Sequence, residues 1–68
     1  MKVTQHAKEQ FIIDVMEKKL TDITDYGEVE QLIQNDLSRA HKIKENHFLF
    51  HDTIFIVRGD RVITVFKD

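Results

Sequence analysis

The chain has 68 residues, with 12 acidic residues against 10 Lys or Arg, a net charge of −2 and no cysteine. A chain this short forms one hydrophobic core, so residues 1–68 are expected to be a single domain. The lack of cysteine excludes disulfides and cysteine-based zinc sites, and no apolar run approaches the roughly 20 residues of a membrane span. The first residues also lack the apolar segment of a signal peptide. We therefore expect a cytoplasmic protein without a membrane contact and without a metal or other cofactor.

Two helices are predicted in the first half of the chain. Apolar residues at helical spacing indicate a helix from about Thr4 to Leu20. A second helix is predicted to begin after Asp25, which can cap it together with Glu28 three positions on, and to continue through Leu37.

The last third of the chain predicts a β-hairpin. Residues 53–58 and 61–66 are rich in β-branched and aromatic residues, and Gly59-Asp60 between them suits a two-residue turn. An earlier bend is predicted at His51-Asp52, and residues 41–45 fit either a short edge strand or the tail of the second helix. The expected fold is α+β, with two N-terminal helices packed on one face of a small antiparallel sheet in the order α-α-β-β-β. The expected core residues are Phe11, Val15, Val29, Leu32, Ile33, Phe55, Val57 and Phe66.

Both faces of this hairpin are apolar. If Val57 pairs with Val62, strict alternation predicts one face with Ile54, Ile56, Arg58, Arg61, Ile63 and Val65, and another with Phe55, Val57, Val62, Thr64 and Phe66. Two short helices cannot cover both faces, so the second face is expected either to be closed by another chain or to form a pocket. We therefore expect a homodimer or a cognate protein partner.

Charge is distributed unevenly along the chain. Residues 1–37 carry four Lys and eight acids, whereas residues 38–68 carry six Lys or Arg and four acids. Any contact with nucleic acid is therefore expected in the second half. Arg39, Lys42 and Lys44 are the candidate RNA-binding residues there.

Three residues are candidates for catalysis: His6, Arg58 and Arg61. An imidazole at the start of the first helix can act as a general acid or base near neutral pH, although the alternative is an ordinary histidine at the border of the apolar stripe. Two arginines on opposite strands beside a turn repel one another unless an anion such as a phosphate lies between them. The alternative is a pair of solubilising residues that blunt the hairpin end.

The other histidines do not form a metal motif. His47 and His51 have the spacing that brings ligands together on a helix, but they lie in a predicted strand and bend.

The chain resembles the BrnT and RelE ribonuclease toxins, especially a branch that opens with a "His-Ala-x-Glu-Arg" helix. The matching segments are residues 4–11, TQHAKEQF, and residues 61–66, RVITVF. The resemblance implies a translation-linked endoribonuclease in which His6 is the acid or base and Arg58 or Arg61 contacts the RNA phosphate. The arginine of that motif, four residues after the histidine, is Gln10 here.

Two functions follow as hypotheses. The first is a small toxin-like protein that cleaves RNA with His6, assisted by Arg58 and Arg61. The alternative is a non-catalytic module, encoded by a phage or another mobile element, that binds or inhibits a host protein. The absence of the motif arginine at Gln10 and the acidic first half favour the alternative.

Overall fold

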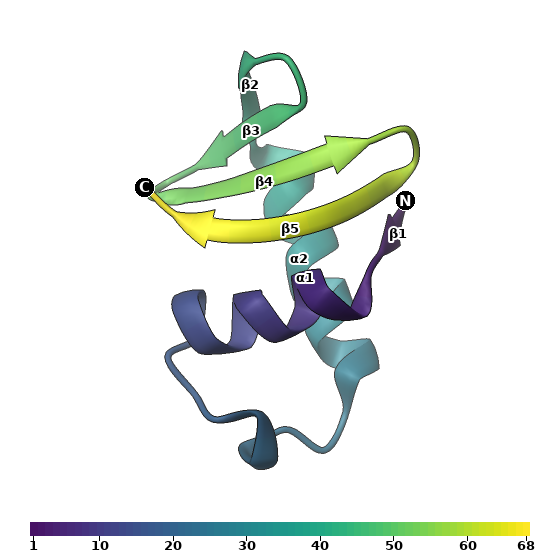
Figure 1. Cartoon of the computed structure of the whole chain (residues 1–68), viewed down its shortest axis with the longest axis vertical. Coiled ribbons are helices and arrows are strands. Elements are labelled where there is room, and N and C mark those ends of the chain that lie inside the picture. Colours follow the sequence, from purple (N-terminus) through teal and green to yellow (C-terminus); the bar gives the residue numbers. More distant parts are fainter.

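The computed structural model describes residues 1–68 and contains five strands and two α-helices. Strand β1 spans Lys2–Val3, helix α1 spans Gln5–Gln10 and continues as a π-helical segment over Phe11–Val15, and a 3₁₀ turn covers Leu20–Asp22. Helix α2 spans Tyr26–Arg39, and the remaining strands are β2 (His41–Lys44), β3 (His47–Phe50), β4 (Thr53–Arg58) and β5 (Arg61–Lys67). The strands form one sheet in the order β1-β5-β4-β3-β2 (Figure 1).

The predicted α-α-β-β-β arrangement is wrong in three respects. The sheet has five strands and not the three that were predicted. The chain begins with a strand, so the helices are inserted between β1 and the rest of the sheet. The sheet is also mixed, because β1 pairs parallel to β5 while every other neighbouring pair is antiparallel. Strand β1 has two residues, which is too short for an alternating pattern to be visible in the sequence.

The helices differ in how closely they follow the prediction. Helix α2 begins where predicted, since the Asp25 carboxylate accepts hydrogen bonds from the backbone N–H groups of Gly27 and Glu28 at 2.9 and 3.3 Å. The first helix does not reach Leu20, because Glu17 has a φ of 56° and an α-helix cannot continue through that conformation.

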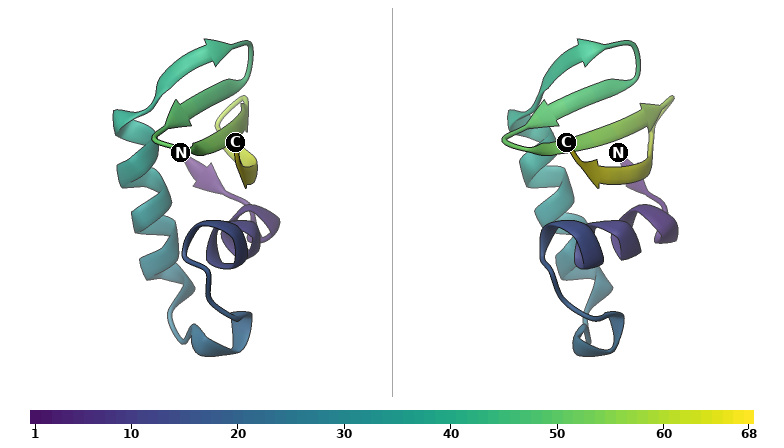
Figure 2. Two further views of the ribbon diagram at one scale, coloured as in Figure 1. Left: turned by 90° about the vertical axis from the view of Figure 1, so that its left-hand side faces the viewer. Right: turned by 60° about the vertical axis from the view of Figure 1, so that its left-hand side comes forward.

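Both helices lie on one side of the sheet, which we call the inner face. Helix α2 crosses behind the sheet and α1 runs alongside β5 (Figures 1 and 2). The inner face meets the helices in a core where the rings of Phe11 and Phe55 stack at 6.5 Å. Five of the predicted core residues are buried there: Phe11, Val29, Ile33, Phe55 and Val57. Val15 is half-buried, and the prediction is wrong for Leu32 and Phe66, which are 39% and 38% exposed.

The predicted pairing of Val57 with Val62 is confirmed, but the predicted faces are not. Ile56 pairs with Thr64, so Ile63 is an extra residue that forms a bulge in β5. From Thr64 onward, every side chain of β5 therefore lies on the face opposite to the predicted one. Val65 accordingly joins Phe55 in the core. The side of the sheet turned away from the helices, which we call the outer face, carries Leu49, Ile54, Ile56, Thr64 and Phe66.

Candidate functional site

His6 is held against strand β5 by the start of α1. Thr4 caps the helix by accepting a hydrogen bond from the N–H of Ala7 at 3.1 Å, and its own N–H donates to the carbonyl of Val62 at 3.1 Å. These bonds place the His6 Nε2 atom 3.2 Å from the Thr64 Oγ1 atom. His6 is exposed, and its Nδ1 atom makes no hydrogen bond within the protein. One ring nitrogen is thus positioned by the protein while the other faces solvent.

The bulge at Ile63 creates this contact. With regular alternation from Val62, which is buried on the inner face, Thr64 would also point inward. The extra residue turns Thr64 to the outer face opposite Ile56, where His6 reaches it from the edge of the sheet. No glycine or other signal marks the bulge in the sequence, so this position of Thr64 was not predicted.

The two hairpin arginines lie side by side on the outer face. Arg58 pairs with Arg61 across the turn, and Gly59 makes this tight turn with a φ of 61°. Both arginines are exposed. Because Val57 and Val62 point inward, Arg58 and Arg61 point outward.

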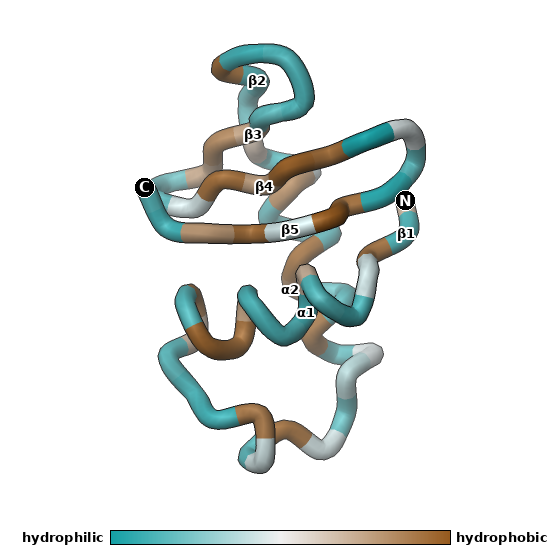
Figure 3. Tube along the Cα trace, in the orientation of Figure 1, coloured by the Kyte–Doolittle hydropathy of each residue, from teal (hydrophilic) through white to brown (hydrophobic).

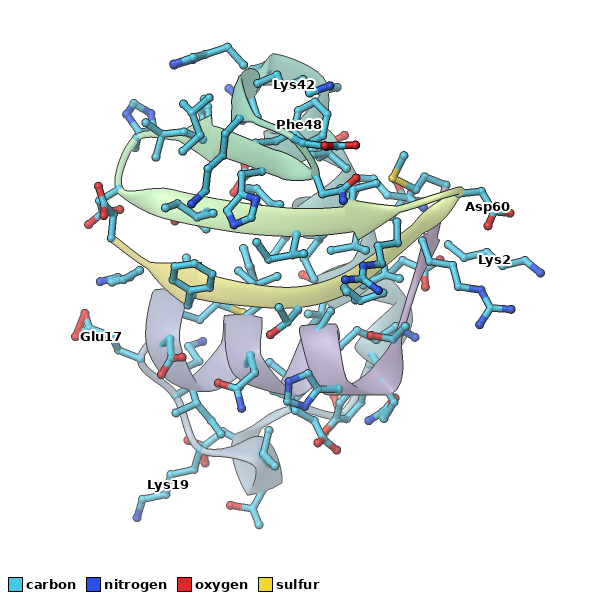
Figure 4. The ribbon with its side chains drawn as sticks, turned by 45° about the horizontal axis from the view of Figure 1, so that its top comes forward. Lys2, Glu17, Lys19, Lys42, Phe48 and Asp60 are labelled. Carbon is cyan, nitrogen blue, oxygen red and sulfur yellow. The ribbon has the colours of Figure 1, made fainter.

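Lys2 extends this pair into a row of three cations. On β1, Lys2 pairs with Arg61, and the neighbouring pair of Val3 with Val62 is buried, so Lys2 shares the outer face with the arginines. We call Lys2, Arg61 and Arg58 the cation row; it crosses β1, β5 and β4 at the end of the sheet marked by Lys2 and Asp60 in Figure 4. Lys2 was not among the predicted site residues, because its place depends on the unpredicted strand β1.

The cation row has no ionic partner within the protein. The two ion pairs of the chain are Lys8–Glu30 at 3.3 Å and Arg39–Asp36 at 3.2 Å. Like charges directly opposite one another destabilise a sheet, and no carboxylate, Asp60 of the turn included, lies within 4 Å of these cations. The guanidinium groups of Arg58 and Arg61 therefore keep their donors available to an external anion.

His6 and the arginines share a face and lie close along it. Thr64 is opposite Ile56, and Arg58 follows two residues later on the same strand. Two residues of a strand span about 7 Å, so Thr64, which contacts His6, and the arginine pair are about that far apart along the strands.

The three predicted RNA-binding residues are not brought together. Lys44 pairs with His47, and His47 pairs with Ile56 on β4. Because Ile56 lies on the outer face, Lys44 lies there too. Lys42 pairs with Phe48 of the inner face. Arg39 is already engaged by Asp36 and lies over the ring of Phe50 at 4.7 Å. Only Lys44 can supplement the cation row.

The remaining histidines have separate surroundings. His47 Nδ1 lies 2.8 Å from the carbonyl oxygen of Glu45, and the ring of His51 packs on Phe50 at 4.2 Å. No group of three or more His, Asp or Glu side chains converges anywhere in the chain.

An apolar pocket lies on the inner side of the sheet, away from His6 and the cation row. A pocket of about 460 Å³ opens between α2 and the strands, and five of its seven lining residues are hydrophobic. The lining residues are Met1, Gln34, Leu37, Ser38, Ala40, Phe48 and Val57. Gln34 bridges its rim by donating a hydrogen bond of 2.7 Å to the carbonyl of Met1. The pocket does not include His6 or the cation row.

Comparisons with protein-family models, curated proteins and solved structures found no match to this chain. The similarity to BrnT and RelE toxins therefore stays a prediction. None of the helices has the length and apolar character needed to cross a membrane.

Proposed function

We propose that this protein binds RNA through the cation row and cleaves a phosphodiester bond beside His6. The observation that carries the proposal is the row itself, in which Lys2, Arg61 and Arg58 occupy one register line on three adjacent strands without a carboxylate partner. Phosphate groups are the natural counter-charge for such a row, and the arginines can bind them in a bidentate manner.

His6 supplies the proton transfer in this proposal. Its free Nδ1 atom takes the proton of a ribose 2′-hydroxyl, and the 2′-oxygen then attacks the adjacent phosphorus. The bond from phosphorus to the 5′-oxygen breaks, and the leaving oxygen takes a proton from the protonated imidazole or from water. Arg58 and Arg61 stabilise the extra negative charge of the transition state.

Thr64 is a positioning residue in this scheme. Its hydroxyl holds Nε2 and thereby fixes the plane of the imidazole against β5. The exposed location of His6 and the arginines suits a polymer that lies across a surface better than a small substrate that needs an enclosed cavity.

The salt dependence of RNA binding tests the proposal. A labelled single-stranded RNA is titrated with the protein at several salt concentrations, and each neutralised phosphate contributes roughly −0.7 to the slope of log affinity against log salt. The double variant Arg58→Gln with Arg61→Gln is expected to weaken binding and to reduce the size of that slope by about 1.4.

Lys19→Gln is the matched control, because Lys19 is an exposed cation that lies away from the sheet (Figure 4). It should bind RNA as the unmodified protein does. Equal binding by the arginine double variant would refute the proposed RNA surface.

The apolar pocket favours a second candidate, a protein-binding module. A pocket of this size between α2 and β3 can take an apolar side chain of a partner protein. Ser38→Phe, at an exposed position on the pocket wall, would fill it. Capture of one specific protein that this variant loses, without any affinity for RNA, would favour the second candidate over the first.

A further inference from the structure

The β4–β5 hairpin carries a pair of like charges at each end. Arg58 and Arg61 face one another beside the turn. At the other end, Asp52 and Asp68 continue the ladder beyond the pair of Thr53 with Lys67, and the N–H of Asp68 donates to the carbonyl of Asp52 at 2.7 Å. Both aspartates are exposed, and neither forms an ion pair. Each end of the hairpin therefore has an unrelieved charge, and the two ends have opposite signs.

The surface between these charged ends is mostly apolar. Figure 3 shows hydrophobic central segments of β4 and β5 between hydrophilic ends. On the outer face these segments carry Ile54, Ile56, Thr64 and Phe66, with His47 and Leu49 beside them on β3. Ile54 is buried among its neighbours, so Phe66 is the most exposed of the apolar side chains. Phe66 is 38% exposed although it lies beside Ile54 in a sheet, and neither helix covers this side.

The positive end of this hairpin is complementary in charge to the negative end of a second copy that runs in the opposite direction. Asp52 and Arg58 are six residues apart, which is about 20 Å along a strand. A two-fold axis through the middle of the hairpin exchanges these ends, so the arginines of one copy lie over the aspartates of the other. The same axis places the two apolar surfaces in contact, as in aligned sheet packing, where strand directions stay within about 30°.

We propose that two copies of this chain associate face to face through the outer surfaces of β3, β4 and β5. The open edge of the sheet is less suited to self-association. Strand β2 carries Lys42 and Lys44 and has a register irregularity between them, which are features that oppose edge pairing.

The association has a consequence for RNA, and this consequence rests on the proposed function. Arg58 and Arg61 become covered in the dimer, so RNA and a second copy compete for the same surface. RNA binding is then strongest for the free chain.

Charge-reversal variants test the dimer by sedimentation equilibrium over a wide concentration range. Asp52→Arg with Asp68→Arg makes both ends of the hairpin positive, and Arg58→Asp with Arg61→Asp makes both ends negative. The unmodified protein is expected to reach the mass of two chains as its concentration rises, whereas each double variant alone stays at the mass of one chain.

An equimolar mixture of the two double variants restores complementary charges and is expected to give the two-chain mass again. This recovery also shows that both variants are folded, and Lys19→Asp serves as a control that dimerises normally. An unmodified protein that stays monomeric, a double variant that dimerises as well as the unmodified protein, or a mixture without recovery would each overturn the proposal.

The aspartate variant separates the dimer from the proposed function, because it leaves the cation row intact. Its RNA binding should equal or exceed that of the unmodified protein. Dimerisation as described, together with no RNA binding by any variant, would reject the RNA function and leave the dimer standing.

Discussion

The Nε2 atom of His6 lies 3.2 Å from the Oγ1 atom of Thr64, although 58 positions separate the two residues in the chain. This contact joins the first turn of α1 to the outer face of the sheet. It depends on the bulge at Ile63, which turns Thr64 outward. The bulge thus puts the contact of His6 on the same face of the sheet as the hairpin arginines, and the short strand β1 adds Lys2 to that face.

Thr64→Val tests whether this contact matters for catalysis. The substitution keeps the shape and the β-propensity of the side chain but removes the hydroxyl that holds His6. A lost hydrogen bond of about 1 kcal/mol corresponds to a rate reduction of about 5-fold. RNA cleavage should therefore slow while RNA affinity stays the same. A variant with unchanged kcat would show that Thr64 does not position His6.

The two hairpin phenylalanines should differ sharply in their contribution to stability. Phe55 is fully buried and stacks on Phe11, so Phe55→Ala is expected to lower the free energy of unfolding by about 3–5 kcal/mol. Phe66 lies on the outer face at 38% exposure, so Phe66→Ala should cost much less in the free chain. Urea unfolding at low protein concentration measures both values. Similar losses for both variants would contradict the assignment of faces.

The features that were predicted correctly from the sequence are local ones. The Gly59-Asp60 turn, the pairing of Val57 with Val62 and the Asp25 cap are local features, and each was predicted from residues that lie close together in the chain. Turn and cap chemistry acts over a few residues, so the sequence pattern reveals it directly.

The features that were not predicted depend on contacts between distant residues. Strand β1 is recognisable only through its pairing with β5, and the bulge at Ile63 resolves a register that strict alternation misassigned. The end of the first helix was missed because Glu17 adopts a left-handed conformation without the glycine that usually signals it. The cation row and the contact of His6 with Thr64 follow from these distant pairings.

The Asp25 cap should contribute measurably to stability. Asp25→Ala leaves the N–H groups of Gly27 and Glu28 without their acceptor, which is expected to cost about 1 kcal/mol. Gln31→Ala, at an exposed position inside α2, is the control and should change stability by less than about 0.5 kcal/mol. Chemical denaturation followed by far-UV circular dichroism checks both. Equal effects of the two variants would argue against the cap.

Gly59 is expected to tolerate substitution poorly for a conformational reason alone. Its φ is 61°, and a Cβ added there meets no atom within 4 Å. Gly59→Ala should therefore lower stability by about 1–2 kcal/mol through backbone strain, whereas Gly59→Asn should cost less because asparagine tolerates this conformation. The thermal midpoints of the two variants give the comparison. An alanine variant as stable as the asparagine variant would rule out strain as the cause.

Cleavage of RNA by purified protein tests the central claim most directly. Single-stranded RNA is incubated with the unmodified chain, with His6→Asn and with the control Lys19→Gln, and the products are resolved by length and by end chemistry. We expect discrete fragments with 2′,3′-cyclic phosphate ends from the unmodified chain and the control, and intact RNA from His6→Asn. Intact RNA in every sample, or equal cleavage by His6→Asn, would contradict the proposal that His6 makes this chain a ribonuclease.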